Sequence, residues 1–117
     1  MSEKKIKEKS YEFALKIIRL VRSIPKDTAG YVLGRQLIRS GTSIGANVEE
    51  AQGASSKKDF INKINIAKKE ARETKYWLSL IADSEILTRD RVVSLIDECS
   101  SIVNILTAIV KTSTHNL

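Results

Sequence analysis

Residues 39–52 read RSGTSIGANVEEAQ, a run of small and hydroxyl side chains that contains two glycines. Such a run is typical either of a loop that binds phosphate or of a helix that lets a second helix come close. A phosphate-binding loop needs G-x-x-x-x-G-K-[ST] between a strand and a helix. Here Gly41 and Gly45 are four residues apart, no Lys-Ser/Thr pair follows, and no strand precedes. The spacing therefore favours a packing helix.

The apolar spacing extends this interpretation to the whole chain. In the second segment Leu37, Gly41, Ile44, Val48 and Ala51 are spaced by alternating steps of four and three residues. Three other segments show the same heptad-like seam, which is typical of helices that pack nearly parallel or antiparallel. Their seams are Phe13, Ile17, Leu20 and Ile24; Phe60, Ile64, Ala67, Ala71, Thr74, Leu78 and Ile81; and Val92, Ile96, Cys99, Val103, Leu106 and Val110.

Short breaks separate the four segments. Pro25 ends the first seam, and Asp27 or Thr28 can cap the second helix. Ser56 and Asp59 resemble a capping box before the third helix, and Thr88 is a candidate cap for the fourth. Short connections make consecutive helices antiparallel. The sequence thus predicts an all-α fold, an up-down-up-down four-helix bundle that fills residues 1–117 as a single domain.

Bulk composition narrows the setting. The longest uncharged run, Cys99 to Val110, is shorter than the roughly 20 residues of a membrane span, so we expect no membrane segment. The lysine-rich N-terminus has no apolar core, which argues against a signal peptide. The single cysteine, Cys99, cannot form an internal disulfide and is compatible with a reducing compartment. A cytoplasmic location is the expectation.

The fourth segment is more apolar than one bundle core requires. Leu95, Ile102, Ile105 and Ile109 lie beside its seam and widen the apolar face. Either this helix is the most buried of the four, or part of the face forms a subunit interface. We expect a homo-oligomer.

A polar stripe accompanies the opening motif. Arg39, Ser43, Asn47 and Glu50 are spaced by four, four and three residues along one side of the second helix. These groups either face solvent or form a hydrogen-bonded network between helices or subunits, in which each buried member must find a partner. We predict that they are buried and structural.

The net charge of +6 suggests an acidic partner such as nucleic acid. Residues 1–26 contain eight Lys or Arg against three Glu, and residues 57–84 contain seven basic against four acidic residues. Within these two segments several basic residues fall on one stripe of each predicted helix. The stripe of the first helix, which also includes Glu12, consists of Lys5, Lys9, Lys16, Arg19 and Lys26. The stripe of the third helix consists of Lys58, Asn62, Asn65, Lys69 and Arg72.

Lysine stripes of this kind can follow phosphates, but they can equally be ordinary solvated faces. No aromatic residue is expected among them, which argues against base stacking as the main contact. The first and third helices should be diagonal in the bundle, so that only an oligomer would join their two surfaces.

An enzyme is not expected. His115 is the only histidine, and no second cysteine or Ser-His-Asp set is present. Glu49, Glu50, Glu70 and Glu73 lack the Glu-x-x-His pairs of di-iron bundles, and salt bridges with lysines explain them more simply. We therefore predict no catalytic residue, no metal site and no cofactor.

Residues 39–78 closely resemble the four-helix bundle family of bacterial 23S rRNA intervening-sequence proteins. The family pattern has Arg-Ser, then Ser-Ile, then Asn-Ile/Val with an acidic residue, a Ser-Lys-x-Asp/Glu-Phe turn, and Ala-x-x-Glu-x-x-Tyr-Trp/Leu-Leu. The matching residues are Arg39, Ser40, Ser43, Ile44, Asn47, Val48, Glu50, Ser56, Lys57, Asp59, Phe60, Ala67, Glu73, Tyr76 and Leu78. Ala51 departs from the glycine that relatives commonly carry.

The resemblance implies a left-handed bundle that assembles as a homopentamer. A related group serves diversity-generating retroelements as an accessory protein that binds nucleic acid and a reverse transcriptase. The resulting hypothesis is a non-enzymatic nucleic-acid-binding accessory protein, with RNA or DNA as partner. The alternative is a helical scaffold that binds a reverse transcriptase or another protein and has no nucleic-acid role.

Overall fold

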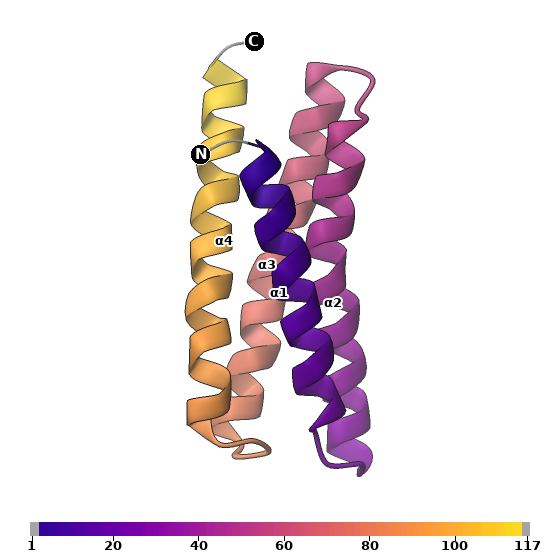
Figure 1. Cartoon of the computed structure of the whole chain (residues 1–117), viewed down its shortest axis with the longest axis vertical. Helices are drawn as coiled ribbons and strands as arrows, with labels where there is room; N and C mark the ends of the chain where they lie inside the picture. The colour runs from indigo at the N-terminus through magenta and orange to yellow at the C-terminus, as the bar shows by residue number, and fades with distance from the viewer. Residues whose placement is uncertain (1–2, 116–117) are drawn as a thin grey trace.

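The computed structural model describes residues 3–115, which form four helices and no strand within that range. They are α1 (Glu3–Arg22), α2 (Thr28–Gln52), α3 (Lys57–Asp83) and α4 (Arg89–His115). Successive helices run in opposite directions, and the α1–α2 and α3–α4 connections lie at the same end of the bundle (Figure 1). The predicted all-α up-down-up-down bundle is confirmed.

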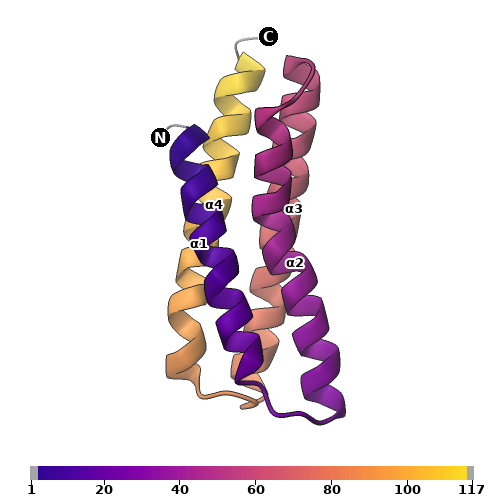
Figure 2. The same ribbon diagram turned by 45° about the vertical axis from the view of Figure 1, so that its right-hand side comes forward.

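The helices form a square in which each one packs against two neighbours. α1 packs against α2 and α4, and α3 packs against α2 and α4, whereas no described Cα atom of α1 comes within 8 Å of one of α3. The second view shows α1 beside α4 and α2 beside α3 (Figure 2). α1 and α3 are therefore diagonal, as expected for this order of helices.

Local sequence signals account for the helix ends. The Asp27 carboxylate accepts a hydrogen bond from the Gly30 amide at 2.8 Å and caps α2. The Ser56 hydroxyl accepts from the Asp59 amide at 3.0 Å and caps α3. α4 begins directly after Thr88. Each cap occupies a backbone N–H that would otherwise lack a partner inside the helix.

α3 ends without a glycine. Glu85 has a left-handed backbone with φ of 61°, its amide donates to the Ala82 carbonyl, and the Ile86 amide donates to Ile81. This pair of bonds is the Schellman arrangement, in which glycine usually occupies the left-handed position. The turn directs the chain back towards α4.

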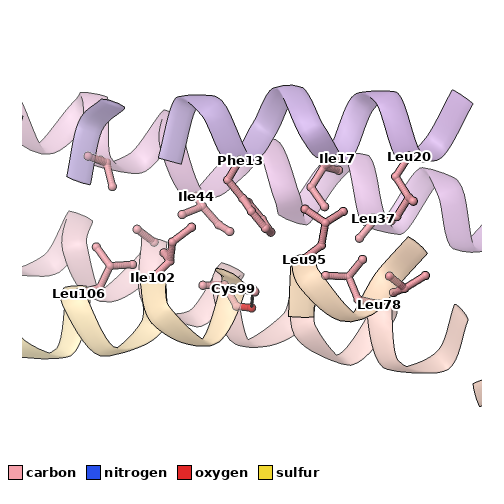
Figure 3. Close-up of a cluster of buried hydrophobic side chains, with 14 of the residues drawn as sticks. Phe13, Ile17, Leu20, Leu37, Ile44, Leu78, Leu95, Cys99, Ile102 and Leu106 are labelled. Carbon is pink, nitrogen blue, oxygen red and sulfur yellow. Dashed lines mark hydrogen bonds between the residues drawn. The ribbon is translucent and has the colours of Figure 1, made fainter. Parts of the chain in front are cut away.

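The core contains most of the predicted seam residues. Phe13, Ile17, Leu37, Ile44 and Leu78 are fully buried and meet between the helices (Figure 3). All five seam residues predicted in α2 are buried, and six of the seven in α3 are buried, Phe60 being half-buried. The seams of α2 and α3 are thus confirmed nearly residue by residue.

The seam predicted for α4 is only half correct. Ile96, Val103 and Val110 are half-buried, and the buried line is instead Val92, Leu95, Cys99, Ile102, Leu106 and Ile109. Both lines alternate steps of three and four, so both fit the helical period. Contacts with α1 and α3 bury the observed line. Ile96, Val103 and Val110 are left at the margin of the core.

Glycine brings α1 and α2 together. A Cβ atom built on Gly41 would lie 2.9 Å from Cγ2 of Ile17, a fully buried side chain of α1. A Cβ on Gly45 would lie 3.4 Å from the Ser10 carbonyl oxygen, which is ordinary contact. Residues 39–52 are therefore part of a packing helix, and Gly41 occupies the closest helix contact.

Candidate nucleic-acid interface

One helix presents a continuous basic face. Lys58, Asn62, Asn65, Lys69 and Arg72 of α3 are all exposed, on the side of α3 opposite its buried seam. We call these five residues the α3 face. Within residues 3–115, no salt bridge involves Lys58, Lys69 or Arg72. The three cations are available to an anionic partner.

An aromatic residue continues the α3 face beyond its last cation. Tyr76 follows Arg72 by four residues, is 59% exposed, and packs edge-on against Trp77 with ring centroids 5.1 Å apart. The 4, 3, 4, 3 spacing of the α3 face, extended by one more step of four, reaches Tyr76. Tyr76 lies beyond the last residue of the predicted stripe, so no aromatic stands among the five residues, but one extends their face.

The stripe predicted on α1 does not form a comparable face. Lys16 Nζ lies 3.1 Å from a Glu98 carboxylate oxygen on α4, and Lys9 is half-buried. One hollow beside α4 has a lining of mixed charge, formed by Lys5, Glu8, Lys9 and Glu12. Arg19 is exposed next to Arg91 of α4. α1 ends at Arg22, so Lys26 lies in the loop rather than on the α1 stripe.

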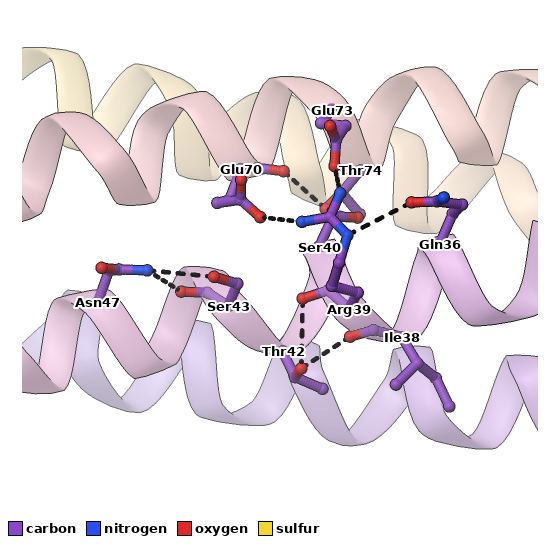
Figure 4. A network of polar contacts seen from close by, with 10 residues as sticks. All are labelled: Gln36, Ile38, Arg39, Ser40, Thr42, Ser43, Asn47, Glu70, Glu73 and Thr74. Atoms are coloured by element: carbon purple, nitrogen blue, oxygen red, sulfur yellow. Dashed lines mark hydrogen bonds and ion pairs between the residues drawn. The ribbon is translucent and has the colours of Figure 1, made fainter.

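The polar stripe of the opening motif splits into two parts (Figure 4). Arg39 Nη1 lies 3.0 Å from Glu70 Oε2, and Arg39 Nη2 pairs with Glu73. The Asn47 amide donates to the Ser43 carbonyl at 2.8 Å and to the Ser43 hydroxyl at 3.1 Å. Arg39 and Glu50 are exposed, whereas Ser43 and Asn47 are half-buried. The stripe lies at the α2–α3 boundary rather than within the core.

The buried part of this network was not predicted. Ser40 and Thr74 are fully buried, and the Thr74 hydroxyl lies 2.9 Å from the Ser40 hydroxyl and 2.8 Å from the Glu70 carbonyl. Glu70 is only 7% exposed, so Arg39 is its partner rather than a surface lysine. Glu49 does pair with a lysine, Lys7, at 3.2 Å. The motif thus holds α2 against α3.

The described residues hold no cluster of metal-ligating side chains. Within residues 3–115, no three His, Cys, Asp or Glu residues lie close enough to hold a metal ion. His115 is exposed in the last turn of α4. Burial raises the pKa of the Cys99 thiol from 9.0 to about 12, although Lys75 opposes the shift, and the thiol donates to the Ala71 carbonyl at 2.9 Å. Cys99 is a protonated core residue at neutral pH.

α4 is more apolar than the uncharged-run count indicated. It is the one helix in the described part of the chain that is long and apolar enough, by length and composition, to cross a membrane. Core helices of soluble proteins meet the same criterion, and α4 contributes six buried side chains to this core.

Comparisons with known proteins agree with the fold and the motif. The family model described as 23S rRNA-intervening sequence protein matches residues 2–108. A crystal structure of a protein of unknown function from the S23 ribosomal protein family of Bacteroides thetaiotaomicron VPI-5482 is 44% identical, with a TM-score of 0.89. The match covers 95% of this chain and 99% of that one. No curated protein matches the chain significantly. The chain belongs to the 23S rRNA-intervening sequence protein family.

Proposed function

We propose that this protein is a non-enzymatic, oligomeric accessory protein of the cytoplasm that binds nucleic acid through the α3 face. The observation that carries the proposal is the row of three exposed cations, Lys58, Lys69 and Arg72, none of which pairs with a carboxylate of the described residues. Lysine and arginine that neutralise phosphates release counterions, which gives affinity that depends little on base sequence. Asn62 and Asn65 can donate to phosphate oxygens or base edges from the same face.

The oligomer is part of the proposal. Ile96, Val103 and Val110 recur every seven residues along α4 and stay half-buried, and Val93 is 41% exposed. A second copy could cover this apolar line, and the family resemblance implies five copies. In such an assembly several α3 faces would act on one nucleic acid, which raises the overall affinity without any new contact.

A specific hollow favours the alternative, a protein-binding scaffold. It lies between the first half of α1 and the second half of α2 and measures about 690 Å³. Its lining includes Tyr11, Ala14 and Ala46, the carboxylates of Glu8, Glu12 and Glu49, and one cation, Lys7, which pairs with Glu49. A reverse transcriptase or another protein with a basic segment could dock there. Recovery of a protein partner that resists nuclease treatment would favour this reading.

The test is binding to structured RNA and to duplex DNA at rising salt. The triple variant Lys58→Gln/Lys69→Gln/Arg72→Gln removes the cations of the α3 face. Its matched control, Lys7→Gln/Arg89→Gln/Lys111→Gln, changes the net charge equally at exposed positions elsewhere. The control breaks only exposed pairs, which are worth roughly 0–1 kcal/mol each. Weaker binding of the first variant alone supports the proposal, and equal loss in both would oppose it.

A further inference from the structure

A second basic surface lies at the end of the bundle that holds the α1–α2 loop. The last turn of α1, the loop and the first turns of α2 enclose a hollow of about 400 Å³. We call it the Tyr31 hollow. Small-ligand sites measure roughly 300–1,000 Å³, so the volume can accept a group of that size. Its lining residues are Val21, Arg22, Ile24, Pro25, Lys26, Gly30, Tyr31, Gly34, Arg35 and Ile38.

The charge of the Tyr31 hollow has one sign. Arg22, Lys26 and Arg35 are exposed, and no Asp or Glu is among the residues that line it. Among the described residues none of these three cations takes part in a salt bridge. The nearest carboxylate in sequence, that of Asp27, accepts from the Gly30 amide and is engaged in capping α2. The hollow therefore attracts anions.

Its apolar part is suited to a flat ring. Tyr31 is 60% exposed and Ile38 is 39% exposed. These two large exposed side chains are seven residues apart and lie on the same side of α2. Ile24 is buried beneath them, and Gly30 and Gly34 add no side chain to the lining. An exposed aromatic ring beside cations offers stacking to any base, because every base has a π-face.

We propose that the Tyr31 hollow binds an unpaired nucleotide of single-stranded nucleic acid. The base stacks on Tyr31 and the flanking phosphates lie against Arg22, Lys26 and Arg35. A duplex keeps its bases stacked inside and cannot offer one to Tyr31, whereas the α3 face needs only phosphates. The site rests on the proposed nucleic-acid function and adds a preference for unpaired segments.

The hollow combines residues that a single-helix pattern separates. Arg22 belongs to α1, Lys26 to the loop, and Tyr31 and Arg35 to α2. The spacing of residues along one helix cannot predict this group, because its members come together only where the chain reverses at Pro25. Along α2 alone, Tyr31, Arg35 and Ile38 recur at steps of four and three.

The first test compares two tyrosines by fluorescence anisotropy with a labelled single-stranded RNA of mixed sequence. Tyr31→Ala should weaken binding about 5- to 150-fold, the range for loss of one stacked base. Tyr11→Ala is the matched control, since Tyr11 is 64% exposed but borders carboxylates. Tyr31→Phe should bind like the wild type, and thermal unfolding should confirm that each variant is folded. Wild-type affinity of Tyr31→Ala, or equal loss in Tyr11→Ala, would overturn the proposal.

The second test separates phosphate contact from general charge. Arg35→Gln should lower the slope of log affinity against log salt by about 0.7 for the single strand and leave the duplex slope unchanged. A single strand carrying 4-thiouridine should crosslink to the tryptic peptide of residues 27–35. If polyglutamate displaces the labelled RNA as effectively as unlabelled single-stranded RNA does, the hollow belongs to an acidic protein segment instead. That result would overturn the proposal.

Different results would exclude the proposed function and the Tyr31 hollow. If the wild type binds no nucleic acid at low salt, the proposed function fails. If it binds and only the α3 face variant loses affinity, the proposed function stands and the Tyr31 hollow is not a binding site.

Discussion

Gly41 shows how one missing side chain determines a helix contact. Ile17 of α1 occupies the space that a Cβ at position 41 would need. Glycine inside a helix costs about 1 kcal/mol relative to alanine, and the close approach of α1 to α2 offsets that cost. The same stretch contains Gly45, where the space is sufficient for a methyl group.

Alanine at the two positions should therefore have opposite effects. Gly41→Ala should lower the free energy of unfolding by about 1–3 kcal/mol, because the stiff, buried Ile17 must move. Gly45→Ala should raise it by up to about 1 kcal/mol through helix propensity. Urea unfolding followed by circular dichroism measures both. Equal stability of the two variants would refute the close-contact role of Gly41.

Arg39 neutralises a carboxylate that is largely removed from water. Arg39→Met leaves Glu70 without its ion-pair partner and should cost about 1–3 kcal/mol of unfolding free energy. Arg35→Met, an exposed cation of the same helix without a salt bridge, should change stability by less than about 0.5 kcal/mol. The double variant Arg39→Met/Glu70→Met should recover part of the loss. A wild-type urea midpoint for Arg39→Met would show that the pair contributes nothing.

Cys99 makes stability depend on alkaline pH. The unfolded thiol ionises near pH 9, whereas burial keeps the native thiol protonated up to about pH 12. The native state then binds more protons between these values, so stability falls as pH rises, by up to about 1.4 kcal/mol per pH unit.

Cys99→Ala removes this dependence while lysine titration affects both proteins alike. From pH 8 to pH 10.5 the stability advantage of the wild type over Cys99→Ala should shrink by about 2 kcal/mol. Guanidinium unfolding at the two pH values provides the comparison. An advantage that stays constant would mean that the thiol ionises as easily in the native protein as in the unfolded chain.

The buried faces of α2 and α3 could be predicted from the sequence, whereas the buried face of α4 could not. Large apolar residues beside the α2 and α3 seams are scattered, such as Ile38 and Ile66, and do not form a second line at steps of three and four. α4 carries two apolar lines side by side, and periodicity alone cannot distinguish them. The Tyr31 hollow could not be predicted for a similar reason, because the turn of the chain at Pro25 forms it from two different helices and the loop between them.

The half-buried line of α4 leads to a prediction about assembly. Ile96→Glu/Val103→Glu should reduce the mass measured by light scattering towards that of one chain, because charge on this line opposes its burial against another copy. Ser94→Glu/Ser101→Glu, on the side of α4 that faces α1, is a control for charge on this helix. An unchanged mass in the first variant would place the subunit interface elsewhere.

The molecule as a whole separates structural from exposed polar groups. The family motif binds α2 to α3 through Arg39, Glu70 and Glu73, whereas the α3 face and the Tyr31 hollow each present three exposed cations. Sequence patterns identified the α3 face because one helix carries it entirely. The same patterns placed Lys16 on a free basic stripe, because its partner Glu98 is 82 residues away in the sequence and cannot be recognised from spacing along one helix.

The most direct test of the nucleic-acid function is a salt titration of binding to duplex DNA. For the wild type, the slope of log affinity against log salt should be negative and close to −0.9 for each phosphate neutralised. The triple variant of Lys58, Lys69 and Arg72 should have a slope smaller in magnitude by about 2–3 units per protomer in contact, with the matched control unchanged. Absence of binding to duplex DNA and structured RNA at low salt would contradict the account.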